Sequence, residues 1–286
     1  MQFNTLLKGF VSGVADNHLH LALYQDPLTV VEEFINWGGV YLLDVAVKPA
    51  HLQVSKNIKR KFKDVVYVAF GIHPEYLKPA YALAPEERND VFKSPAQLQQ
   101  AFLQVFDPKL VDVIGEVGLD LYRVQQPNKQ EVLSKQEEVF AFFIKIAQEY
   151  NKPLMLHLRG VDRNDFSLHT RALEILKDMG VYTIDDMVVY FHSYTGYLEL
   201  AKKIIDKGFY LGFNGIATYS SAAHLQEVIK LVPWSQLLVE TDAPFLTPNL
   251  GVEYTPGGIW QYKEQSKNHP IWTYALNKYF MELKNG

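Results

Sequence analysis

The stretch VADNHLH, from Val14 to His20, is a short apolar run that ends in two histidines. Seven further short apolar runs recur along the chain: VYLLDVAV from Val40, VVYVAFGIHP from Val65, VDVIGEVGLD from Val111, PLMLHLR from Pro153, VVYFHS from Val188, FYLGF from Phe209 and LLVETDAP from Leu237. The runs are rich in Val, Ile, Leu, Tyr and Phe and give way to Gly, Pro or charged residues, which is typical of buried strands. The sequence therefore predicts eight strands.

The segments between these runs have helical spacing. In residues 133–150, Val139, Phe142, Phe143 and Ile146 keep to one helical face. A second helix is expected from Leu198, with Gly208 placed to end it. Strands that alternate with helices predict a parallel sheet, and eight such units predict an α/β fold that is a single (β/α)8 TIM barrel. The length of 286 residues slightly exceeds the typical ~250 of this fold, so residues 1–286 are expected to form a single domain.

Composition narrows the class of protein. The chain has no cysteine, which excludes disulfides and leaves nitrogen and oxygen as metal ligands. The first fifteen residues do not read as a signal sequence, because Lys8 interrupts them and cleavage near Ala15 would sever the first strand. No run approaches the ~18 apolar residues that span a bilayer. We expect a soluble, cytoplasmic protein without a membrane partner or an obligate protein partner.

Six potential metal ligands follow the apolar runs: His18, His20, Glu116, His157, His192 and Asp242. Active sites of (β/α)8 barrels gather at the carboxyl ends of the strands, so this distribution predicts a hydrolytic metal site. Residues two apart in a strand share a face, and His18 and His20 can therefore chelate one ion. For an isolated pair of this kind, solvated or core histidines are the alternative.

The three middle ligands come from three different runs. Glu116 ends an apolar run between two glycines, and its two carboxylate oxygens can bridge two cations; an exposed loop acid is the alternative. His157 and His192 are imidazole donors at strand ends, where a single histidine is more often a hydrogen-bonded core residue. Five of the nine histidines lie at predicted strand ends, and this clustering favours ligation.

Asp242 completes the set in the run LLVETDAP. Pro244 ends the strand, and an acid beside a metal can both coordinate it and accept a proton from water. Asp242 is therefore the predicted general base. Glu240, two residues earlier on the same face, is either a partner that orients a histidine or a buried charge held by pairing.

The motifs DNHLHL, GIHPEY, IGEVGLDLYR, KPLMLHLR, FHSYTG, GFYLGFNGIATY and VETDAPFLTP, in this order, resemble the TatD-type metal-dependent hydrolases, often described as TatD-related deoxyribonucleases. The resemblance runs from about Asp16 to the end of the chain. It implies two divalent metal ions, with His18, His20 and Asp242 on one, His157 and His192 on the other, and Glu116 bridging. Mg²⁺ is the ion expected in function, with Zn²⁺ or Mn²⁺ as alternatives.

The resemblance also implies substrate contacts. His73 of GIHP matches a histidine near the substrate phosphate and is expected to act as an acid or a phosphate donor; a capped turn is the alternative. Arg159 is expected to clamp an anionic oxygen, and a surface ion pair is its alternative. The aromatic residues near the predicted loops are candidates for stacking on bases, against a core or surface role: Tyr76, Tyr122, Tyr194, Tyr219 and Tyr254.

The function expected from these residues is metal-dependent phosphodiester hydrolysis by an exonuclease that acts on DNA ends, with single-stranded ends as the expected partner. A metal-dependent hydrolase of a small ester, amide or lactone, or of misacylated tRNA, would use the same ions and water. The formal net charge of −4 gives no broad basic surface and leans toward these alternatives. An inactive barrel that serves as a binding module is disfavoured, because all six ligand types are present.

Three features depart from the family pattern and leave substrate preference open. Asn268-His269-Pro270 stands where relatives carry Asn-Glu-Pro, and Lys263, Glu264 and Lys267 replace the basic residues before it. An acidic insert, residues 161–165, lengthens the connection after Arg159. The longest irregular stretches, residues 78–95, 159–170 and 244–270, are predicted active-site loops.

Overall fold

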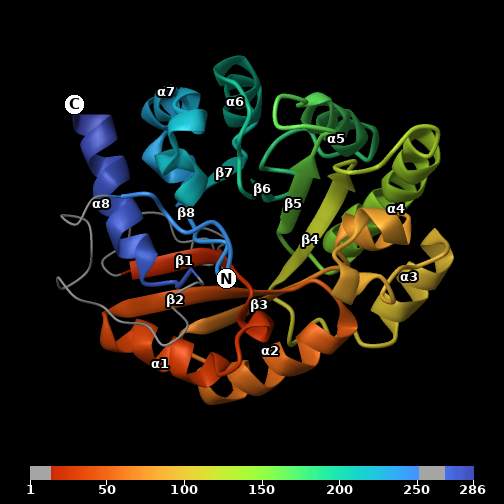
Figure 1. Cartoon of the computed structure of the whole chain (residues 1–286), viewed down its shortest axis with the longest axis horizontal. Helices are drawn as coiled ribbons and strands as arrows, with labels where there is room; N and C mark the ends of the chain where they lie inside the picture. Colours follow the sequence, from red (N-terminus) through yellow and green to blue (C-terminus); the bar gives the residue numbers. More distant parts are fainter. Residues whose placement is uncertain (1–13, 251–267) are drawn as a thin grey trace. The chain divides into compact units, whose positions relative to one another are not determined.

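The computed structural model describes residues 14–250 and 268–286 and contains all eight predicted strands (Figure 1). They form one sheet in sequential order, and the strand pairs with a described register are parallel, which confirms the predicted (β/α)8 barrel fold. Their bounds are β1 (Val14–Leu19), β2 (Gly39–Ala46), β3 (Val66–Phe70), β4 (Val113–Asp120), β5 (Leu154–Arg159), β6 (Val189–Phe191), β7 (Tyr210–Phe213) and β8 (Leu237–Val239).

The helices alternate with these strands. Their bounds are α1 (Pro27–Asn36), α2 (Pro49–Lys61), α3 (Pro95–Leu103), α4 (Lys129–Glu149), α5 (Ser167–Asp178), α6 (Leu198–Ile205), α7 (His224–Leu231) and α8 (Trp272–Asn285). The predicted helix over residues 133–150 is α4, with Val139, Phe143 and Ile146 buried. Gly208, at φ 80°, follows the end of α6 and donates its backbone N–H to the carbonyl of Ile205, as predicted.

Internal packing divides the chain into two units. The first contains β1, β7 and β8 with α1, α6, α7 and α8, and in Figure 1 α8 lies beside α7. The second contains β4, β5 and β6 with α3, α4 and α5, and α4 packs against β4. That residues 1–286 act as a single domain stays a prediction.

In the first unit, the pairing of β1 with β8 continues past the end of β8. Asp242 donates its backbone N–H to the carbonyl of His18 (2.9 Å), and His20 donates to Ala243 (2.7 Å). The buried Asn17 side chain adds a bond from Nδ2 to the carbonyl of Val239 (2.8 Å). The end of β1 and the segment after β8 are therefore held together where three predicted ligands lie.

In the second unit, Glu116 lies inside β4 and not at its end, which corrects the sequence interpretation. The β4–β5 register shifts between Ile114 and Val117, as at a β-bulge, and pairing then continues to Asp120. A Cβ atom on Gly118 would lie 2.2 Å from the carbonyl oxygen of His157, so a glycine is needed for the two strands to approach. The glycine at position 118 thus allows the strand to continue past Glu116.

The predicted loops differ partly from the observed ones. Arg159 ends β5 and α5 begins at Ser167, so the irregular connection covers residues 160–166 only. The helix begins early because the Asp165 carboxylate accepts hydrogen bonds from the backbone N–H (3.1 Å) and hydroxyl (2.6 Å) of Ser167. Residues 78–95 are irregular except for two short 3₁₀ turns and the first residue of α3. In the third predicted loop, residues 251–267 lie outside the described residues.

None of the helices within residues 14–250 and 268–286 combines the length and the apolar composition that crossing a bilayer requires.

The Phe102 side chain allows a test of the core of the second unit. It is fully buried, and its ring centroid lies 5.0 Å from that of Phe70 and 4.9 Å from that of Phe143. We expect Phe102→Ala to lower the free energy of unfolding by about 3–5 kcal/mol, measured by urea denaturation, because it leaves a cavity. Leu103→Ala, at a position that is 55% exposed, is the control and should have little effect. Equal losses from both variants would contradict this packing.

Candidate metal centre

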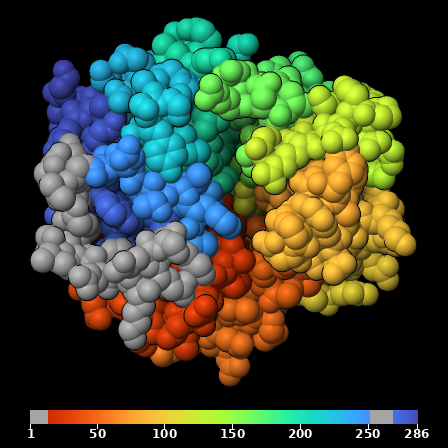
Figure 2. Space-filling model, in the orientation of Figure 1, coloured from red at the N-terminus to blue at the C-terminus, as the bar shows by residue number. Residues whose placement is uncertain are grey.

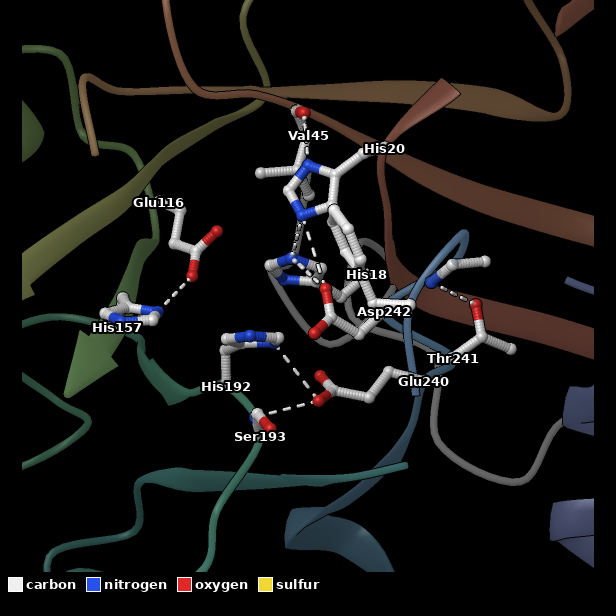
Figure 3. A network of polar contacts seen from close by, with 12 residues as sticks. His18, His20, Val45, Glu116, His157, His192, Ser193, Glu240, Thr241 and Asp242 are labelled. Atoms are coloured by element: carbon white, nitrogen blue, oxygen red, sulfur yellow. Dashed lines mark hydrogen bonds and ion pairs between the residues drawn. The ribbon is translucent and has the colours of Figure 1, made fainter. Parts of the chain in front are cut away.

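The first ligand group joins the end of β1 to the segment after β8 (Figure 3). The Nε2 atoms of His18 and His20 lie 3.2 Å apart, and Asp242 Oδ1 lies 3.5 Å from the first and 3.3 Å from the second. Both histidines are buried, whereas the Asp242 side chain keeps 15% of its surface exposed. Three predicted ligands thus converge, with one of them open to solvent.

The tautomer of His20 suits metal binding. Its Nδ1 atom lies 3.0 Å from the carbonyl oxygen of Val45, which can only accept a hydrogen bond. Nδ1 therefore carries the proton, and Nε2 presents its lone pair toward His18 and Asp242. A histidine fixed in this way by its second nitrogen is the usual arrangement of a metal ligand. Two imidazole nitrogens and a carboxylate oxygen are a donor set that fits a divalent cation.

The buried Asp16 carboxylate holds this group in place. Its Oδ1 accepts the backbone N–H of His18 (3.1 Å) and of Thr241 (3.0 Å), and Oδ2 accepts the Thr241 hydroxyl (2.5 Å). Burial raises the pKa of Asp16 to about 7, although these hydrogen bonds oppose the shift. Asp16 thus fixes the backbone of His18 and the residue directly before Asp242, which has φ 56°.

His192 lies in the same unit and contacts the first group. Its ring stacks on that of His18 with centroids 3.5 Å apart, and its Nδ1 lies 3.1 Å from Glu240 Oε1. The same oxygen accepts hydrogen bonds from the backbone N–H of Ser193 (2.8 Å) and from Asn214 Nδ2 (3.2 Å). Glu240 is fully buried, so it matches both interpretations of the sequence, a partner of a histidine and a buried charge held by pairing.

The second ligand group lies in the other unit and consists of His73, Glu116 and His157. His157 Nδ1 is hydrogen-bonded to Glu116 Oε1 at 2.6 Å, as Figure 3 shows. His73 Nε2 lies 3.6 Å from the same oxygen. His73 Nδ1 also accepts the backbone N–H of Glu75 (3.2 Å), so the capped turn is present, and Nε2 still faces the ligand group. Glu116 and His157 offer donors that fit a divalent cation, whereas the bond from Glu75 leaves the proton of a neutral His73 on Nε2.

Asp120 contacts His157 and is itself paired with Lys78. The sequence predicted no role for either residue. Asp120 Oδ2 lies 3.3 Å from His157 Nε2 and 2.8 Å from Lys78 Nζ, and both the carboxylate and the ammonium are buried. Burial alone would raise the pKa of Asp120, but the His157 hydrogen bond and the Lys78 charge outweigh it and hold that pKa well below its usual range. Asp120 therefore stays an anion, as a carboxylate that orients a metal-binding histidine must.

Arg159, the last residue of β5, lies over the ring of Tyr122, with its guanidinium carbon 3.6 Å from the ring centroid. It makes no ion pair with any described residue, so the alternative of a surface ion pair does not account for it. Tyr76 and Tyr194 are each only 1% exposed, which leaves their rings inaccessible to stacking bases. Tyr219 is partly buried, and Tyr254 lies outside the described residues.

The structure thus brings the predicted ligands into two groups. The first contains His18, His20, Asp242 and the adjoining His192; the second contains Glu116 and His157, with His73. The pairing of His192 with His157 on one ion stays a prediction. Asp16 and Asp120 were visible as acids beside the ligand motifs and could have been found there. Lys78 carries no sequence signal, because nothing near it in the chain indicates a buried partner.

With this geometry established, comparison with known proteins identifies the family. The family described as TatD related DNase matches residues 15–285. The chain belongs to the TatD-related DNase family. The sequence resemblance to this family, stated from the motifs, is confirmed over nearly the whole chain.

Individual relatives agree with this assignment. An uncharacterized metal-dependent hydrolase, YcfH of Escherichia coli K12, is 38% identical over 242 residues, which cover 82% of this chain and 79% of the relative. An uncharacterized metal-dependent hydrolase of Buchnera aphidicola is 28% identical over 94% of this chain and 88% of the relative. The crystal structure of YjjV, a TatD homolog from E. coli K12, has the same fold, with a TM-score of 0.68 and 23% identity over 94% of this chain and 90% of that one.

Asn268, in the segment that departs from the family pattern, contacts the residues on both sides of Asp242. Asn268 donates from Nδ2 to the carbonyls of Thr241 (3.0 Å) and Phe245 (2.6 Å), on either side of Asp242. His269 Nε2 lies 3.2 Å from Glu33 Oε2 of α1. The segment after β8 is at the surface in Figure 2, in light blue, and Phe245 within it is 51% exposed. Lys263, Glu264 and Lys267 lie outside the described residues.

The buried pair of Lys78 and Asp120 gives a stability prediction. We expect Lys78→Met to lower the free energy of unfolding by about 3–5 kcal/mol, because it leaves a buried carboxylate without its cation. Adding Asp120→Asn should restore part of this loss. Lys202→Met removes a lysine from an exposed pair with Glu199 and should change stability little. Denaturant titrations that gave the two lysine variants equal stabilities would show that the buried pair has no special weight.

Proposed function

We propose that this protein is a metal-dependent hydrolase that cleaves phosphodiester bonds in DNA, as an exonuclease acting at single-stranded ends. The observation that carries the proposal is the convergence of His18 Nε2, His20 Nε2 and Asp242 Oδ1, with the His20 tautomer fixed by Val45. Membership of the TatD-related DNase family and the metal-dependent hydrolases among its relatives support it.

We assign His18, His20 and Asp242 as ligands of one divalent ion, and Glu116 and His157 as ligands of a second. His192 is the sixth predicted ligand. When bound, such an ion lowers the pKa of water toward neutrality and neutralises charge on a phosphate. Mg²⁺ is the proposed ion in function, and the histidine ligands also suit Zn²⁺ or Mn²⁺.

Asp242, His73 and Arg159 have separate roles in the proposed hydrolysis. Asp242, partly open to solvent, accepts the proton of the attacking water, so that the water oxygen forms the new bond to phosphorus. The bond from phosphorus to the leaving oxygen breaks, and His73 supplies the proton that this oxygen takes up. Arg159, which has no acidic partner among the described residues, holds a non-bridging phosphate oxygen.

A second candidate function is the hydrolysis of a small ester, amide or lactone, or of misacylated tRNA. The net charge of −4 and the acidic side chains of Asp162 and Asp165 in the connection after β5 favour it over a nuclease with a broad basic surface. The two functions differ in salt dependence, because contacts to phosphates weaken as salt rises and contacts to a neutral substrate do not.

The test is the release of nucleotides from end-labelled single-stranded DNA in Mg²⁺ or Mn²⁺, beside a chelated sample. We expect shortening from one end that requires metal and that Asp242→Asn lowers by about 10²–10⁴-fold, since it removes the general base. Asp206→Asn, at an exposed acid after α6, is the matched control and should retain full activity.

The absence of DNA cleavage would decide between the two candidate functions. DNA left intact by a protein that binds divalent ions, as measured by calorimetry, would refute the nuclease proposal and favour the second candidate function.

A further inference from the structure

A tight turn after β4 presents an arginine in an unusual conformation. Val124 donates its backbone N–H to the carbonyl of Leu121 (3.1 Å), which closes a four-residue turn with Arg123 in its third position. Arg123 has φ 64°, in the left-handed region that glycine or asparagine normally occupies at this place. Such strain persists only where the surroundings enforce it, and it is concentrated at functional sites.

The turn places two guanidinium groups at one aromatic ring. The guanidinium carbon of Arg159 lies 3.6 Å from the centroid of Tyr122, and that of Arg123 lies 5.2 Å from the same centroid. Both distances are within the range of a cation–π contact. Within residues 14–250 and 268–286, neither arginine makes an ion pair, and both side chains are exposed. Two positive charges thus gather at one ring without an ion-pair partner in the part of the chain that the structure describes.

The backbone of Tyr122 is held by the two residues that support the second ligand group. Tyr122 donates its backbone N–H to Asp120 Oδ1 (2.8 Å), and its carbonyl accepts from Lys78 Nζ (3.3 Å). Leu121 donates its backbone N–H to the carbonyl of Arg159 (2.9 Å), which fixes the turn against the end of β5. The same Asp120 contacts His157, so the two arginines have a defined position relative to the second ligand group.

We propose that Arg123, held on the ring of Tyr122 beside Arg159, forms a subsite for a second backbone phosphate of the nucleic acid strand, next to the phosphodiester that Arg159 contacts. This inference rests on the proposed function and names a substrate-binding residue for it. Guanidinium groups bind phosphate through two parallel hydrogen bonds, and a planar ring below them limits their orientations before the phosphate arrives. Tyr122 then acts by positioning the arginines, and its ring face is occupied by Arg159 instead of a base.

The subsite predicts a dependence on substrate length. Arg123→Gln should raise KM for a trinucleotide, which has two phosphodiesters, and lower its kcat/KM by about 10–100-fold, as expected for the loss of a hydrogen bond to a charged group. Thymidine 5′-(4-nitrophenyl) phosphate has a single phosphodiester, and its kcat/KM should not change. Arg123→Lys should restore part of the loss, because lysine retains the charge but cannot form two parallel hydrogen bonds to a phosphate.

Two controls separate charge from position. Arg60→Gln removes the same charge from an exposed position on α2 and should leave both substrates unaffected. Tyr122→Leu, which removes the ring under both arginines, should lower kcat/KM for both substrates and more strongly for the trinucleotide, whereas Tyr122→Phe, which retains the ring, should show a much smaller loss. If Arg123→Gln lowered the activity equally on both substrates, or left both activities unchanged, the subsite would be overturned.

A binding measurement keeps this test independent of catalysis. Binding of a fluorescent oligothymidine is measured by anisotropy at several salt concentrations, with a chelator present. Arg123→Gln should weaken binding and reduce the slope of log affinity against log salt by roughly 0.7, the value for one phosphate contact on a single strand. An unchanged slope would overturn the subsite even if the DNA is cleaved. A reduced slope in a protein that cleaves no DNA would retain the subsite and refute the nuclease proposal.

Discussion

The hydrogen bonds accepted by the buried Asp16 carboxylate are the constraint on which the first ligand group depends. Asp16 belongs to β1, but two of its three described bonds come from Thr241, directly before Asp242. The first and last strands of the sheet are therefore joined through a side chain as well as through their backbones. Without this carboxylate, the separation of His18 and Asp242 would depend on the backbone hydrogen bonds beyond the end of β8 and on the side-chain bonds of Asn17 and Asn268.

A second buried carboxylate, Asp120, has the corresponding role in the other unit, with different chemistry. Asp16 is satisfied by neutral donors, and burial raises its pKa to about 7. Asp120 has the ammonium of Lys78 beside it and a depressed pKa. A protein interior accepts an ionised carboxylate more readily when a cation lies next to it. The two ligand groups are thus supported by carboxyl groups whose pKa values are shifted in opposite directions. Lys78 also contacts the turn that carries Tyr122.

The sequence was sufficient for the fold because strands that are buried on both faces are mostly apolar, and most of the eight appear as short apolar runs. The ligands were predicted because they follow those runs. Glu116 was placed wrongly at a strand end, since a glycine that permits close strand approach looks the same as one that ends a strand. Lys78 was missed because its partner Asp120 is distant in sequence, and the turn at Arg123 was missed because an arginine does not indicate a left-handed backbone.

The left-handed backbone of Asp242 has a consequence for how such a chain can change over generations. Aspartate and asparagine are the residues, after glycine, that most readily adopt a φ of 56°. A single base change in an aspartate codon gives asparagine, which can keep the same backbone and the same packing. Catalysis can therefore be lost at this position while the folded protein persists, and a duplicated copy is free to keep the scaffold and its anion contacts for another purpose.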